Sequence, residues 1–152
     1  MTIEQTLRQG LDKMVQDIIA ASRAAGQQAS GQTYANIHVE VSGHEGVVYA
    51  PSYLYTLAVG RGSGKVPYNF PDILLEWAKN KDISFDSPVA ARRWANAVAW
   101  KIRRDGSLLF RERQTIDILD TPIAAFEVWL DKQLGVLFTA EIEDTFIPLY
   151  RK

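Results

Sequence analysis

The segment YLYTLAVGRGSGKVP, residues 53–67, decides how the middle of this chain is built. Its aromatic first half leads into Gly60–Lys65, which has three glycines among six residues. Glycine adopts backbone conformations that strain other residues, so this density predicts a surface loop, here a mobile and basic one. Two amphipathic helices are predicted between this loop and Phe110. A layout of this kind is typical of a protein that docks onto a partner.

The second of these two helices has the clearest signals. Ser87 is a predicted N-cap, and Pro88 follows it in the first helical position. Arg103 and Arg104 fall in the last turn, where positive charge complements the helix dipole, and Gly106 is the expected stop. The apolar stripe of this helix consists of Ala91, Trp94, Ala95, Val98 and Ile102.

The helix before it is predicted to start near Asn69 and Pro71. Its expected buried side consists of Ile73, Leu74, Trp77 and Ala78. We assign Trp77 and Trp94 to the core by their positions in these stripes. Trp100 falls on a different side of its helix, which indicates a second apolar face that meets a partner or another layer of the core.

Apolar periodicity outside this middle region predicts a helix at each end and a hairpin between them. The helical spacing of three and four runs through Thr2–Ala25, and the alternation in Ile37–Val41 predicts a half-buried strand that returns through Val47–Ala50. The last helix is expected from Asp120 to about Thr145, with Gly135 as a candidate bend or break.

These elements predict an α+β fold, with a small antiparallel hairpin-based β-sheet packed against three or four α-helices. The length of 152 residues predicts a single domain over 1–152. Its expected parts are an N-terminal helix at 2–25, an α+β core at 34–113, and a C-terminal helix and tail at 120–152.

Composition narrows the class of protein. Apolar residues make up 47% and charged residues 23%, as in ordinary globular domains. The chain has no cysteine, which excludes disulfides and thiolate chemistry and fits a reducing compartment. No apolar run approaches the roughly 20 residues needed to cross a bilayer. The start Met1-Thr2-Ile3-Glu4 lacks the pattern of a signal peptide. We therefore expect a soluble protein made in the cytoplasm, with no membrane partner.

Charge is unevenly distributed although the net charge is only −1. Residues 91–113 hold seven Lys or Arg and two Asp or Glu, a net charge of +5, whereas residues 114–152 hold three and seven, a net charge of −4. Such a polarised chain can place its basic face beside the acidic face of a neighbouring copy. Alternatively, the acidic segment folds back onto the basic helix of the same chain. The sequence leaves both arrangements open.

Motifs for catalysis or cofactor binding are weak. Around Gly64-Lys65 a phosphate-binding P-loop would need a glycine at Val59 and a serine or threonine at Val66. The two histidines, His38 and His44, lie on and just after the first predicted strand, outside any metal-ligand spacing. A second set of candidates comprises carboxylates that have no histidine or basic residue beside them in sequence: Asp117, Asp120, Glu141, Glu143 and Asp144. We therefore predict no enzyme, no cofactor and no metal site.

The order of elements over residues 37–110 resembles the tailed-phage tail-completion or neck proteins, which are also called head–tail joining proteins or minor tail components. The pattern is an aromatic Tyr-x-Tyr-x-Leu segment ending in Gly-Arg-Gly, a helix with Pro-x-x-Phe-Pro-x-Ile-x-x-x-Trp, and an alanine-rich helix ending in Lys-Ile-x-Arg-x-Gly. The residues that carry the resemblance are Tyr53, Tyr55, Leu57, Gly60, Arg61, Gly62, Pro67, Phe70, Pro71, Ile73, Trp77, Ala95, Ala97, Lys101, Ile102, Arg104 and Gly106.

The resemblance implies a structural virion protein that forms a homo-oligomeric ring at the head–tail junction. Its implied neighbours are copies of itself, the portal-side connector and tail proteins, with DNA passing through the lumen. In that family the glycine-rich loop and the helices mediate subunit contacts. The corresponding candidate interface residues here are Gly60, Arg61, Gly62, Ser63, Gly64, Lys65, Arg92, Arg93, Trp100, Arg103 and Arg104.

Two alternative functions stay open at the level of sequence. The basic segment 92–113 is suited to a nucleic-acid-binding accessory protein, because clustered positive charge binds phosphates. A small enzyme with an unrecognised carboxylate site is the second alternative, since paired carboxylates serve hydrolytic chemistry. Salt-dependent DNA binding would favour the first alternative, and a concave pocket around two or more carboxylates would favour the second.

Overall fold

A computed structural model describes residues 2–27 and 31–150, with the side chains described up to residue 140. The chain folds as two compact units. Unit 1 is made of residues 1–24, 34–50 and 118–152, and unit 2 of residues 25–33 and 51–117. Whether the two units behave as the one predicted domain stays a prediction.

The fold is α+β, as the sequence predicted. Its sheet is a two-stranded antiparallel hairpin of β1 (His38–Ser42) and β2 (Glu45–Tyr49), which belongs to unit 1. The register pairs His38 with Tyr49 and Ser42 with Glu45, and the two rings of the first pair stack at 4.9 Å between their centroids. Burial alternates along both strands, which confirms the predicted half-buried face.

The hairpin packs on the N-terminal helix α1 (Ile3–Ala24). Gly46 of β2 allows this contact, because a Cβ atom there would lie 2.5 Å from Cδ1 of Leu11. Arg8 of α1 also donates a hydrogen bond of 2.7 Å to the carbonyl of Val39. The short helix α2 (Gln32–Ala35) precedes the hairpin and carries the buried Tyr34.

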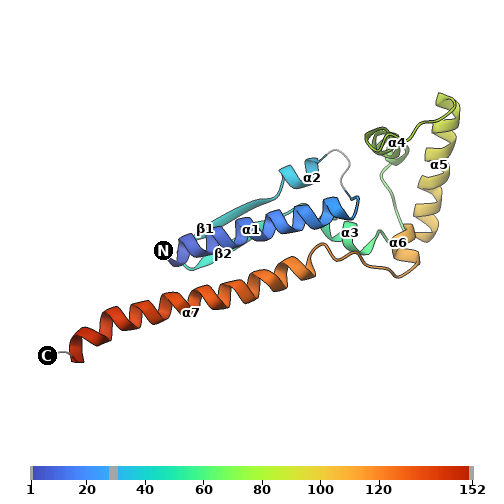
Figure 1. The fold of residues 1–152 in the computed structure, drawn as a ribbon. Coiled ribbons are helices and arrows are strands. Elements are labelled where there is room, and N and C mark those ends of the chain that lie inside the picture. The colour runs from blue at the N-terminus through green and yellow to red at the C-terminus, as the bar shows by residue number, and fades with distance from the viewer. Residues whose placement is uncertain (1, 28–30, 151–152) are drawn as a thin grey trace. The chain divides into compact units, whose positions relative to one another are not determined.

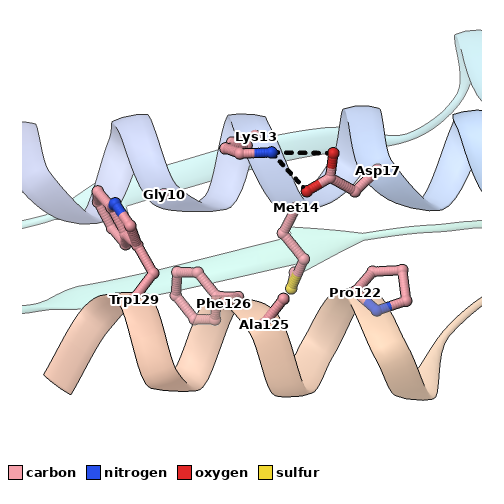
Figure 2. A pocket seen from close by; sticks show the side chains of 8 residues that line it. All are labelled: Gly10, Lys13, Met14, Asp17, Pro122, Ala125, Phe126 and Trp129. Carbon is pink, nitrogen blue, oxygen red and sulfur yellow. Dashed lines mark hydrogen bonds and ion pairs between the residues drawn. The ribbon is translucent and has the colours of Figure 1, made fainter. Parts of the chain in front are cut away.

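A second helix, α7 (Asp120–Tyr150), runs antiparallel to α1 and packs against it (Figure 1). The rings of Phe126 and Trp129 point toward Gly10, as Figure 2 shows, and a Cβ atom on Gly10 would lie 2.2 Å from the Trp129 ring. Lys13 and Asp17 form an ion pair of 2.8 Å beside this contact. The helix contact leaves a small cavity of about 200 Å³. The C-terminal part of α7 continues past the N-terminal end of α1 (Figure 1).

Unit 2 consists of helices α3 (Tyr53–Val59), α4 (Phe70–Asn80), α5 (Pro88–Asp105) and α6 (Leu108–Arg111). The predicted start and end of α5 are confirmed: the side chain of Ser87 accepts a hydrogen bond from the amide of Ala90, and Gly106 is the C-cap. Its predicted stripe is buried or half-buried throughout. Helices α4 and α5 pack against each other.

Four details differ from the sequence predictions. Ile73 and Trp77 are not buried, since 42% and 41% of their surfaces are exposed. The stretch 108–111 forms a helical turn that the sequence did not predict. Helix α7 continues beyond Thr145, because Gly135 in an otherwise helix-favouring sequence does not interrupt it. The glycine loop is held by hydrogen bonds and is not a free loop, as described next.

Candidate functional site

The glycine loop Gly60–Lys65 is anchored to the end of α5 and the start of α6. The amide of Ser107 donates to the carbonyl of Arg61 at 2.8 Å, and the amide of Arg61 donates to Oγ of Ser107 at 2.9 Å. The amide of Gly64 donates to the carbonyl of Arg103 at 2.9 Å. The predicted loop and one predicted arginine, Arg103, are therefore joined through their backbones although they are far apart in sequence.

Two glycines make this anchoring sterically possible. Gly60 has φ 82° and ψ 172°, and Gly106 has φ 84° and ψ 176°, a region that essentially only glycine occupies. A Cβ atom on Gly60 would lie 2.5 Å from the backbone nitrogen of Phe110, and one on Gly106 would lie 2.8 Å from the carbonyl oxygen of Arg61. Neither neighbour is a flexible side-chain end, so both positions require glycine.

The side chain of Arg61 stabilises the glycine loop through contacts inside unit 2. The Arg61 guanidinium donates to the carbonyl of Lys65 at 2.8 Å and lies 5.6 Å from the ring centroid of Phe70 in α4. The side chains of Ser63 and Lys65 are exposed. The loop thus presents Ser63 and Lys65 outward, while Arg61 fastens the loop to its own unit.

Three of the predicted interface residues share the outer face of α5. Arg93, Trp100 and Arg104 are seven and four residues apart, which places them on one side of the helix, and all three are exposed. The Arg104 guanidinium lies 4.4 Å from the centre of the Trp100 ring. Because 59% of the Trp100 surface is exposed, its ring is not buried in a second layer of the core, and its contact with a partner stays a prediction.

Two of the basic side chains in the segment 92–113 are already paired with carboxylates of unit 2. Arg92 contacts Asp72 of α4 at 2.7 Å, and Arg104 contacts Asp105 at 2.5 Å. Arg92 therefore lies apart from the outer-face set and joins α5 to α4. Such pairing lowers the positive charge that this segment offers to phosphates.

We expect the Arg104–Asp105 pair to make the stability of unit 2 pH-dependent. The hydrogen bond from Arg104 lowers the pKa of Asp105 below its ordinary value of 3.8 and outweighs the opposing effect of desolvation. A lowered native pKa means that the stabilisation is present above 3.8 and is lost as the pH falls through the native value. The difference in unfolding temperature between wild type and Asp105→Asn should therefore be small near neutral pH and vanish in acid. A difference that grows in acid would contradict this assignment.

An apolar groove of about 740 Å³ opens between the helices of unit 2. Lys101 and Arg111 lie among its lining residues. Ile73 and Trp77, the two residues whose predicted burial was wrong, belong to its wall. Its apolar lining comes from all four helices of the unit: Tyr53, Leu57, Phe70, Ile73, Leu74, Trp77, Trp94, Val98, Ile102, Leu108 and Leu109.

Sequence reasoning missed this groove because it treated each apolar stripe as core. Periodicity identifies the face of a helix that avoids water but not whether another element covers it. One signal was available: the residues that carry the family resemblance include Tyr53, Leu57, Phe70, Ile73 and Trp77, all of which line the groove.

Two further kinds of site, a metal-binding cluster and a membrane-spanning helix, are not found in the described part of the chain. Among the side chains that the structure describes, those of residues 2–27 and 31–140, no three acidic or histidine side chains come together to hold a metal ion. Among the helices of the same residues, none is long and apolar enough to cross a membrane.

Comparisons with known proteins add no relative. No protein family, no curated protein and no solved structure matches this chain.

Proposed function

We propose that this chain is a structural virion protein of a tailed phage or prophage, a ring-forming subunit that completes the neck or tail and joins the head connector to the tail. Its partners in this role are copies of itself, the portal-side connector and tail proteins, and its place is the assembled virion. DNA passes through the lumen of the ring.

The observation that carries the proposal is the uncovered apolar groove of unit 2. Soluble monomers rarely expose large contiguous apolar patches, and those that do commonly use them to bind another protein. The groove is lined by motif residues of the family that the sequence resembles, among them Tyr53, Phe70 and Trp77. A ring subunit needs such a surface, because each copy must bind the next.

The outer face of α5 supports the same role. Trp100 and Arg104 form an exposed aromatic and cationic pair, and tryptophan and arginine are enriched at the centres of protein interfaces. The groove and this outer face offer a neck subunit two separate surfaces, one for its neighbours in the ring and one for the layer above or below.

Quantitative peptide mass spectrometry on density-purified particles tests the proposal. We expect this chain at a low, fixed copy number relative to the tail-tube protein, as a single ring requires. We further expect that deleting its gene leaves heads and tails unjoined in electron micrographs, and that restoring the gene on a plasmid joins them. Absence of the chain from particles, or normal virions without it, would refute the virion role.

A further inference from the structure

The outer side of α7 carries exposed apolar side chains that unit 1 leaves uncovered. Ala124, Val128, Asp131, Gly135 and Phe138 recur at spacings of four and three, so they form one stripe along the helix, and all five are exposed. The exposed fractions of Val128 and Phe138 are 73% and 50%. The other side of the helix, with Phe126 and Trp129, is the one that packs on α1. We call these five residues the outer stripe.

A helix that is apolar on two sides is typical of a helix buried between two partners. Helix α1 supplies one partner for α7, and the outer stripe indicates a second. Gly135 lies beside open space and has no side chain, so it leaves room for a partner to approach the backbone of α7.

The groove of unit 2 has the shape and polarity for such a helix. Grooves between helices bind amphipathic helices through apolar anchors spaced three, four and seven residues apart. The apolar side chains of the outer stripe are Ala124, Val128 and Phe138; the first two are four residues apart, and Phe138 lies on the same side further along the helix. Four helices supply the apolar wall, and the volume of about 740 Å³ accommodates several side chains.

Charge favours the same pairing. The groove is lined by Lys101 and Arg111 and lies in the part of the chain that carries +5, whereas α7 lies in the part that carries −4. Asp131 stands within the outer stripe, and Glu127 beside it is also exposed. The basic residues of the apolar groove are thus opposite in charge to the acidic helix, which is electrostatic complementarity of the kind that fixes partner choice.

We propose that the outer stripe of α7 docks into the α3–α6 groove of a second copy of this chain. The two surfaces differ, so the contact is heterologous and adds copies head to tail, which closes into a ring when the rotation per copy allows it. This inference rests on the proposed ring-forming role and names the surfaces that build the ring.

Disulfide trapping tests this contact cleanly, because the chain has no cysteine of its own. Full-length Ile73→Cys, in the groove, and Val128→Cys, in the outer stripe, carry different affinity tags and are mixed under mild oxidation. We expect a disulfide-linked dimer that contains both tags and exceeds either self-linked dimer at least about tenfold. Gln16→Cys on the exposed side of α1 replaces Val128→Cys as the matched control and should give no such enrichment. Unchanged thermal unfolding confirms that each variant is folded.

If the groove binds something other than α7 of a second copy, the trapping experiment gives a different result. A double variant with both cysteines that links within one chain at high dilution would mean that the groove binds the chain's own α7, which overturns the inference. Higher oligomers by mass photometry without the mixed-tag dimer would mean that the copies meet through other faces, which overturns the inference and leaves the virion role standing. A chain that stays monomeric and unlinked at all concentrations overturns it as well. Absence of the chain from particles, by contrast, bears only on the virion role.

Charge reversal supplies a second measurement. Lys101→Glu with Arg111→Glu should weaken self-association roughly tenfold or more, because the reversed rim repels the acidic helix. Adding Asp131→Lys should recover part of the loss. Arg113→Glu, an exposed basic residue outside the groove lining, is the control and should change the association constant little. Equal effects of the two kinds of reversal would indicate non-specific electrostatics and overturn the proposal.

Discussion

Replacing Gly60 by alanine should destabilise unit 2 by about 3 kcal/mol or more, because two costs add. The φ of 82° with ψ of 172° belongs to a region that costs about 1–3 kcal/mol for a residue with a Cβ atom. The new atom would also lie 2.5 Å from the backbone nitrogen of Phe110, and forcing a close-packed site apart costs about 1–3 kcal/mol. The backbone of α6 cannot rotate away as a flexible side chain would.

Amide hydrogen exchange measures this loss at the contacts themselves. The amides of Arg61, Gly64 and Ser107 hold the loop to α5 and α6, so their protection should fall together in Gly60→Ala. Gly43→Ala separates the two costs, because Gly43 has φ 59° with nothing within 4 Å of an added Cβ atom, and it should lose only about 1–2 kcal/mol. Wild-type protection in Gly60→Ala would mean that the loop is not packed against α6.

This result bears on how the loop works. The sequence predicted a mobile loop, because three glycines in six residues indicate conformational freedom. The hydrogen bonds from Gly64 to Arg103 and from Ser107 to Arg61 show a different use of glycine. Gly60 allows close approach of two backbone segments, so the loop is part of the unit that holds the groove in shape.

Local signals were sufficient where the structure depends on local interactions. Helix α5 was predictable from Ser87, Pro88 and Gly106, because caps act within one turn of the helix end. The hairpin followed from alternation, since the period of two in a strand is a local property. The half-buried side of β1 contains Val39 and Val41, as predicted.

Elements that depend on distant contacts were not predictable. Helix α3 has a short aromatic sequence with no strong preference, and its last turn is fixed from outside by the hydrogen bond from the amide of Ile116 to the carbonyl of Ala58. The groove depends on four helices at once. The sequence correctly predicted that the side of α4 with Trp77 is apolar. The exposure of Trp77 depends on how α3, α5 and α6 are arranged around α4, which local patterns do not indicate.

Replacing Leu11 by alanine should destabilise unit 1 by about 2–5 kcal/mol. Leu11 is 6% exposed, and its Cδ1 atom lies against Gly46 of β2, so its side chain joins α1 to the hairpin. Removing a buried leucine loses its transfer free energy and leaves a cavity that the surroundings fill only partly. Val136→Ala on α7 is the matched control within the same unit, because 60% of Val136 is exposed and its loss should cost no more than about 0.5 kcal/mol.

The same variant decides whether the predicted single domain exists in solution. Hydrogen exchange in Leu11→Ala should show lost protection in the amides of β1 and β2, which pack on α1. If the chain unfolds as one domain, the amides of α5 in unit 2 lose the same free energy of protection, because global unfolding exposes all of them together. If α5 keeps its wild-type protection while the hairpin loses it, the units of the chain unfold separately, and unit 2 carries its groove as an independently stable body. Equal protection of Leu11→Ala and Val136→Ala throughout the chain would contradict the packing of α1 against the hairpin.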